Sequence, residues 1–450
     1  MRNVKVLLLL IGIISFAACK GKEAGTSASA GKIPLRFTHW DGGSTLEVYD
    51  QMVRDFNQSQ DKIEVTILNM PTDYATKITA MVASGDTPEF SMLDTGDVMY
   101  PFAEEGHVAN IAELAKNDPN FDPSYLNDYS LYWADPTFLV GIAVGAEMIG
   151  LFYSPALFAK YGVPEPPARY ADAWDWDTFV NVAQRLTIDA KGNNALSKDF
   201  DPENIAIYGV TFGKWHAIYF PFVFSAGGEA LSKDGKEFGL FSPEGIDVMQ
   251  KLGDLINKYH VSPTPTATST LPGASEAFLS GKVAMAIEGH WINADLMMDD
   301  VPYDVAALPK IKTPKSEITA GVMCIMNTPR KESAWEFFKF ISQTGRAKPL
   351  EVSGLWLPST KDGYSESYLK SIITDKHPRH YYEAFLEPMI DGTAQRFVPG
   401  YVKNWPKINN DFSAILDPLW YGEKTYIELV NENKDLINAS VQGFRSPGKL

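Results

Sequence analysis

The sequence predicts an α/β protein with more than one domain, and three observations support this prediction. The chain has 450 residues, whereas a single hydrophobic core rarely extends beyond about 250–300 residues. Hydrophobic residues make up 45% of the chain and charged residues 21%, which is typical of globular domains. Near the beginning of the chain, strand and helix patterns alternate with short connections. This order is typical of βαβ units and indicates a parallel sheet.

The first βαβ units occupy residues 33–94. Helices are predicted after Ser44, which has capping-box spacing to Glu47, and over residues 74–84. Strands are predicted at residues 33–40, 63–68 and 88–94. Ligands of parallel sheets bind at the carboxyl ends of the strands. Trp40 and Asp94 stand at two such ends.

A second α/β section extends from about residue 140 to residue 309. Its clearest patterns are a strand at 148–153, a helix at 176–186, and a helix that begins after Ser242 with Pro243 in its first position. An aromatic run at 212–224 indicates mostly core. The final ninety residues or so are rich in helical patterns.

Residues 1–18 have the pattern of a signal peptide. Arg2 and Lys5 precede an apolar run that is too short to span a bilayer, and the segment ends directly before Cys19. A cysteine after two alanines resembles the lipobox of bacterial lipoproteins, although Phe16 stands where Leu is usual. The resemblance implies that Cys19 is acylated and holds an exported protein at the outer face of the cytoplasmic membrane, in the periplasm or at the cell surface. Residues 19–32 would then be the lipidated Cys and a flexible tether; the alternative is ordinary cleavage near a chance cysteine.

The charge and cysteine content exclude several classes of protein. The net charge is −16, and removal of residues 1–18 leaves 38 basic against 56 acidic residues, or −18. This balance argues against a nucleic-acid partner, because phosphate contacts need clustered Lys and Arg. Two cysteines cannot form a disulfide framework, and Cys324 stands in an apolar strand pattern at 322–326 as a small hydrophobic residue. The seven histidines show no convincing metal spacing, so we expect neither a metal nor a cofactor.

Several segments, in order, resemble the extracellular solute-binding proteins of bacterial ABC sugar importers, the class that includes maltose-binding protein. Glu89 departs from this pattern, since the family usually has Asp there. The segments are residues 74–94 (YATKITAMVASGDTPEFSMLD), 149–163 (IGLFYSPALFAKYGV), 174–187 (WDWDTFVNVAQRLT), 277–291 (AFLSGKVAMAIEGHW), 321–342 and 354–359 (GLWLPS).

The resemblance implies a two-lobed periplasmic-binding-protein fold of type II, with discontinuous lobes joined by hinge segments. We expect residues 33–143 and 323–354 to form the N-terminal lobe, and residues 144–322 and 355–450 the C-terminal lobe. The crossings would lie near residues 141–145, 319–322 and 354–358.

The function implied is that of a substrate-binding lipoprotein of an ABC importer. As a monomer, it would capture a sugar or oligosaccharide by hinge closure and deliver it to the transmembrane permease subunits, without catalysis. One alternative is the same fold binding a non-sugar solute such as a polyamine, for which acids with aromatics would be suitable. A less favoured alternative is a surface carbohydrate-active enzyme, since carboxylates beside aromatics also form glycosidase sites.

Candidate ligand-binding residues follow from the chemistry of sugars, which present flat C–H faces to aromatic rings and hydroxyls to carboxylates or Arg. Trp291 matches a tryptophan of the family segment, and Glu147 stands where the family places a sugar-binding carboxylate. Each of these residues could instead have a structural role, as a core aromatic, a helix cap or a solvated surface group. The predicted set is Trp40, Asp41, Tyr74, Asp94, Asp97, Glu147, Trp215, Trp291, Trp356 and Arg396.

Overall fold

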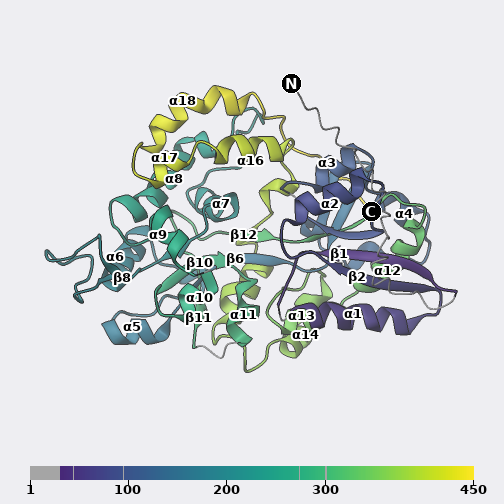
Figure 1. The fold of residues 1–450 in the computed structure, drawn as a ribbon, viewed down its shortest axis with the longest axis horizontal. Helices are drawn as coiled ribbons and strands as arrows, with labels where there is room; N and C mark the ends of the chain where they lie inside the picture. Colours follow the sequence, from purple (N-terminus) through teal and green to yellow (C-terminus); the bar gives the residue numbers. More distant parts are fainter. Residues whose placement is uncertain (1–30, 44, 95, 273, 299–301) are drawn as a thin grey trace, which may run out of the picture.

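The computed structural model describes residues 31–450 apart from residues 44, 95, 273 and 299–301. The predicted signal peptide at 1–18, the lipid attachment at Cys19 and the cap at Ser44 lie outside the described residues. Figure 1 shows two bodies side by side along the long axis, each with a sheet at its centre.

The first body contains a mixed sheet with the strand order β2-β1-β3-β13-β5-β4. Its first three strands are mutually parallel, as the βαβ pattern predicts, whereas β13 runs antiparallel to β3. The strands are β1 (Ile33–His39), β2 (Ile63–Asn69), β3 (Phe90–Leu93), β4 (Leu131–Asp135), β5 (Phe138–Ala143) and β13 (Val322–Ile325).

Alternation along these strands places apolar side chains on both faces of the first sheet. In β13, Met323 and Ile325 join one apolar cluster, whereas Val322 and Cys324 join the other, as the two-residue period of a strand requires. Cys324 is fully buried, as expected of a small hydrophobic residue. The helices of this body are α1 (Thr45–Ser59), α2 (Tyr74–Ala83), α3 (Met99–Glu104), α4 (Ile111–Lys116), α12 (Lys331–Ile341) and α13 (Lys348–Val352).

The second body has a sheet with the order β14-β12-β6-β10-β9, and β11 also pairs with β6. The parallel pairs are β14 with β12 and β10 with β9, and β6 runs antiparallel to its neighbours. The strands are β6 (Glu147–Tyr153), β9 (Thr211–Phe212), β10 (Met285–Gly289), β11 (Asp304–Ala306), β12 (Ser316–Thr319) and β14 (Ala394–Gln395), with a separate pair formed by β7 (Ile188–Asp189) and β8 (Ile205–Ile207).

Helices of the second body surround a large core to which the aromatic run at 212–224 contributes. Ser242 accepts a hydrogen bond from the backbone N–H of Gly245 and caps α8, as its sequence position predicts. The helices are α5 (Pro155–Tyr161), α6 (Trp176–Leu186), α7 (His216–Ser225), α8 (Pro243–Asn257), α9 (Pro265–Thr270), α10 (Ala274–Leu279), α11 (Ile292–Met298), α14 (Glu366–Ile372), α15 (Glu387–Asp391), α16 (Trp405–Ser413), α17 (Asp417–Trp420) and α18 (Tyr426–Asn438).

The chain passes between the two sheets more than once. It leaves the first sheet between β5 and β6 and returns between β12 and β13. A third connection lies beside the first, because Leu357 forms an isolated bridge with Ala146. The three passages lie between residues 143 and 147, between residues 319 and 322, and beside Leu357.

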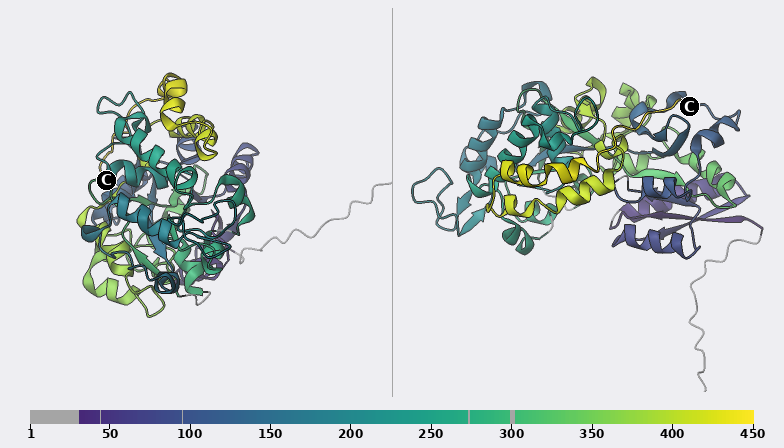
Figure 2. Two further views of the ribbon diagram at one scale, coloured as in Figure 1. Left: turned by 90° about the vertical axis from the view of Figure 1, so that its left-hand side faces the viewer. Right: turned by 90° about the horizontal axis from the view of Figure 1, so that it is seen from above.

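The end of the chain differs from the predicted assignment of residues 355–450 to the second lobe. After α18 the chain returns to the first body, as the right-hand view of Figure 2 shows. The Arg445 guanidinium lies 3.5 Å from the Tyr100 ring centroid, and Leu450 packs against the core of the first sheet. The last residues therefore form an additional contact between the bodies.

None of the helices in the described part of the chain is both long and apolar enough to cross a membrane.

Candidate functional site

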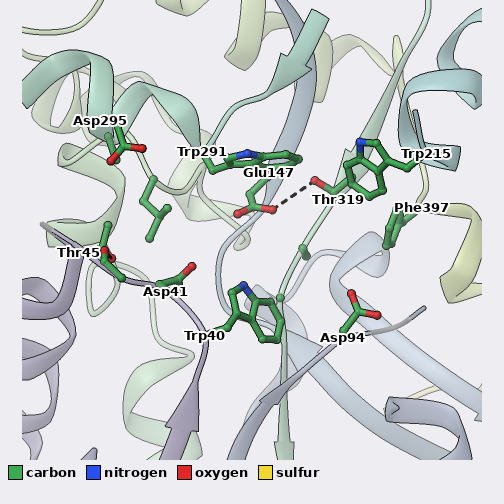
Figure 3. A pocket seen from close by; sticks show the side chains of 15 residues that line it. Trp40, Asp41, Thr45, Asp94, Glu147, Trp215, Trp291, Asp295, Thr319 and Phe397 are labelled. Atoms are coloured by element: carbon green, nitrogen blue, oxygen red, sulfur yellow. Dashed lines mark hydrogen bonds between the residues drawn. The ribbon is translucent and has the colours of Figure 1, made fainter. Parts of the chain in front are cut away.

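A cavity of about 410 Å³ lies where the edges of the two sheets face each other (Figure 3). The first sheet contributes Trp40 and Asp41 after β1 and Asp94 after β3. Because β1 and β3 are parallel, their carboxyl ends meet at one edge, as the sequence predicts.

The strands along the path of the second sheet each bring one side chain to the facing edge. Trp215 and Trp291 follow the parallel strands β9 and β10, and Glu147 begins β6, which is antiparallel to β10. Thr319 ends β12, and Phe397 lies just after β14, which is parallel to β12. Strand direction alone therefore places these five residues at the same edge.

Three tryptophans and one phenylalanine supply the apolar walls of the cavity. The ring centroids of Trp215 and Trp291 lie 6.0 Å apart with a 51° angle between their planes. Trp291 lies over Gly289, where an added Cβ would approach the indole ring to 2.0 Å. Trp40 is half-buried and makes an edge-to-face contact with Tyr74. These aromatic faces are suited to flat C–H surfaces and to cations.

Carboxylates from both bodies line the same cavity. Asp41 accepts a hydrogen bond from the Tyr49 hydroxyl, and Asp94 accepts from the backbone N–H groups of Gly96 and Asp97. Glu147 accepts from the Thr319 hydroxyl at 3.3 Å, the dashed contact in Figure 3.

Burial makes these carboxyl groups unusually weak acids. Burial and, after it, the negative charge of Asp41 raise the pKa of Glu147 to about 8, although the hydrogen bond from Thr319 opposes the change. Burial also raises the pKa of Asp41 to about 6, although the hydrogen bond from Tyr49 opposes the change. The pKa of Asp94 is raised to about 6, mainly by burial and then by the charge of Asp97. No Lys, Arg or His is among the described residues that line the cavity, so its wall offers no side-chain cation to offset these charges.

Four of the predicted ligand-binding residues lie outside the cavity lining. Tyr74 is buried behind Trp40, and its hydroxyl donates to the carbonyl of Met92. Asp97 is exposed and contributes its backbone N–H to Asp94.

For the other two predicted residues, Trp356 and Arg396, a residue next to them in the chain lines the cavity in their place. Trp356 is 2% exposed and packs against Tyr49 edge-to-face, whereas its neighbour Leu355 lines the cavity. Arg396 donates to the carbonyl of Leu131 and lines a different cavity, whereas Phe397 lines this one.

Several lining residues were not predicted from the sequence: Thr45, Asp295, Thr319, Leu355 and Phe397. Asp295 carries a usable signal, since it lies four residues after Trp291 and four residues bring side chains to one helix face. In the described residues, no group of three or more His, Cys, Asp or Glu side chains could hold a metal ion.

A cavity between two α/β bodies that are connected by several chain passages defines the class of two-lobed solute-binding proteins. The model of the bacterial extracellular solute-binding protein family matches residues 42–347, and the chain belongs to this family. It is a substrate-binding protein of the ABC importer class.

Curated and solved proteins show the same relationship. The chain is 24% identical over 383 residues to the sn-glycerol-3-phosphate-binding periplasmic protein UgpB of Brucella suis, covering 81% of this chain and 84% of that protein. The structure of an ABC substrate-binding protein from Listeria monocytogenes in complex with cycloalternan is 22% identical, with a TM-score of 0.73 and coverage of 91% and 99%. UgpB from Mycobacterium tuberculosis, solved with glycerophosphocholine, is 15% identical, also with a TM-score of 0.73, and coverage is 91% and 98%. At these identities the solved structures establish the two-lobed fold.

Proposed function

We propose that this protein captures a carbohydrate in the cavity between its two bodies for ABC import. The observation that carries the proposal is the convergence of Trp40, Trp215 and Trp291 with carboxylates from both sheets in one cavity. Aromatic faces stack on the C–H faces of sugar rings, and carboxylates accept hydrogen bonds from sugar hydroxyls. The carbohydrate complex of the Listeria relative supports this choice.

A phosphate ester fits the cavity less well, although the Brucella relative is named for sn-glycerol-3-phosphate. Anionic groups are bound by Arg, Lys or backbone N–H groups. The lining instead has Asp41, Asp94, Glu147 and Asp295 and, among the described residues, no basic side chain. Placing a dianion there would add like charges in a poorly solvated space.

Capture would proceed by closure of two lobes about the three chain passages. We assign residues 33–143 and 323–354 to one lobe and residues 144–322 and 355–450 to the other, except that the last residues return to the first. A ligand that contacts Trp40 on one side and Trp291 on the other makes its full set of contacts only in the closed form. It therefore shifts the population towards that form.

We further propose how the protein is held and which partner it meets. The acylated Cys19 would hold the protein at the outer face of the cytoplasmic membrane, and the closed monomer would dock on the transmembrane permease subunits.

The protein would bind its ligand without turnover. Incubation of the purified protein with neutral oligosaccharides, followed by chromatography of the sugars, tests this point, and cleavage products would instead support a carbohydrate-active enzyme.

A thermal-shift screen against mono- and oligosaccharides tests the capture of a carbohydrate, because a ligand that binds only the folded state raises its melting temperature. We expect at least one sugar to raise the melting temperature of the wild type and to have little effect on Trp291→Ala. Trp174→Ala is the matched control, since Trp174 is half-buried on the same body but outside the cavity. No shift with any sugar would contradict the proposal, as would equal shifts in wild type and Trp291→Ala.

A further inference from the structure

The side chains of the cavity are rich in hydrogen-bond acceptors and poor in donors. Asp41, Asp94 and Glu147 present carboxylate oxygens. The two lining hydroxyls already donate within the protein: Thr45 to the carbonyl of Gly42 at 2.8 Å, and Thr319 to Glu147. Apart from the proton that Glu147 holds in its neutral form, the indole N–H groups of the tryptophans are then the side-chain donors that the described lining offers to a ligand.

This imbalance distinguishes between kinds of carbohydrate. Each sugar hydroxyl donates one hydrogen bond and can accept two, so a neutral sugar enclosed here would leave most of its acceptors without side-chain partners. An ammonium group has three donors and no acceptor. It is also attracted to the face of a tryptophan ring. An amine therefore matches both the carboxylates and the aromatic walls.

We propose that the solute is a carbohydrate bearing a protonated amine, with the ammonium group held between Asp41 and Glu147 and near the indole of Trp291. This inference rests on the proposed function and specifies the class of sugar. Asp41 belongs to the first body and Glu147 to the second. A cation shared by the two carboxylates would therefore contact both lobes at once.

The electrostatics of the cavity agree with this assignment. Burial, and after it the negative charge of Asp41 across the cavity, disfavour the ionised form of Glu147 and raise its pKa. Tyr49, which donates to Asp41, and Tyr132 also interact with Glu147, and burial raises the pKa of both phenols, so both stay neutral. An ammonium group between the carboxylates would replace repulsion with attraction in the closed form. It would also favour the ionised form of Glu147 and release its proton on binding.

The test uses oligosaccharides that share a β-1,4-linked glucose backbone and differ only at carbon 2. These are the cello-oligosaccharides, with a hydroxyl, the chitin oligosaccharides, with an N-acetyl group, and the glucosamine oligomers, with an ammonium group; glucosamine and galactosamine complete the set. Binding to the full chain is measured by calorimetry at pH 7 in two buffers of different ionisation enthalpy. Spermidine serves as a cation without a sugar ring.

We expect an amine compound to bind at least 10-fold more tightly than its hydroxyl and N-acetyl counterparts, with an enthalpy that depends on the buffer because a proton is released. Glu147→Gln should lose this preference, whereas Glu423→Gln, at an exposed turn, should keep it. Neutral members that bind as tightly as the amines, or amines that do not bind at all, would overturn the inference. Binding of a neutral sugar would still support the proposed capture of a carbohydrate. Binding of spermidine without binding of any sugar would overturn that proposed function.

Discussion

The substitution Glu147→Gln tests how the protein tolerates a buried carboxyl group in its cavity. Burial and the charge of Asp41 raise the pKa of Glu147 from 4.5 to about 8. A group whose pKa is raised on folding contributes its stabilisation below its unfolded pKa. That contribution is lost as pH rises towards the folded pKa. The stability of the wild type should therefore fall between about pH 4.5 and pH 8 because of this one residue.

The size of the effect follows from the same pKa difference, since one pKa unit is worth about 1.4 kcal/mol. The raised pKa of Glu147 lowers the free energy of unfolding by on the order of 1 kcal/mol at pH 5 and by on the order of 4 kcal/mol at pH 8. Glutamine is neutral at both pH values and can still accept the hydrogen bond from Thr319. We therefore expect Glu147→Gln to be more stable than the wild type, with an advantage that is about 3 kcal/mol larger at pH 8 than at pH 5.

The assay is urea denaturation at pH 5 and pH 8 in the absence of sugar. Glu423→Gln is the control for removing an exposed charge and should differ from the wild type by about the same small amount at both pH values. An advantage of Glu147→Gln that is equal at pH 5 and pH 8 would contradict the raised pKa, because it would show that Glu147 titrates normally in the folded protein.

Three further substitutions test how the cavity is supported. Gly289→Ala places a Cβ 2.0 Å from the Trp291 ring and should weaken sugar binding by calorimetry about 10-fold; unchanged affinity would show that Trp291 has room to move without loss. Gly145→Ala places a Cβ 2.2 Å from the Trp356 indole and should lower the free energy of unfolding by about 1–3 kcal/mol, which an unchanged urea midpoint would contradict. Tyr74→Phe removes a buried hydroxyl and its hydrogen bonds, so stability should fall by about 1 kcal/mol while affinity stays within 2-fold; a large loss of affinity would place Tyr74 among the ligand contacts.

The part of the fold that sequence reasoning predicts is the part built from periodic elements. The parallel strands β1, β2 and β3 are confirmed, and so is the meeting of Trp40 and Asp94 at one edge, because strand direction fixes where a strand ends. Family resemblance supplied the two-lobed architecture, which the alternation of strands and helices cannot specify.

Residues in short or irregular segments were placed less well. β14 has two residues, too few for a periodic pattern, so nothing in the sequence indicates that Phe397 faces the cavity and Arg396 faces away. Trp356 stands between two leucines, and in such an apolar run the side that faces a cleft depends on tertiary packing. The proximity of Gly145 to the indole shows how that packing is achieved.

Whether this cavity is the ligand site is tested by calorimetry of wild type, Trp291→Ala and Trp174→Ala with the sugar that gives the largest thermal shift. Trp291 lies at the edge where both bodies contribute to the cavity, and loss of its stacking contact should cost about 2 kcal/mol or more. We expect Trp291→Ala to weaken binding by at least about 30-fold and Trp174→Ala to change it less than about 3-fold. Unchanged affinity in Trp291→Ala would contradict the assignment of this cavity as the ligand site.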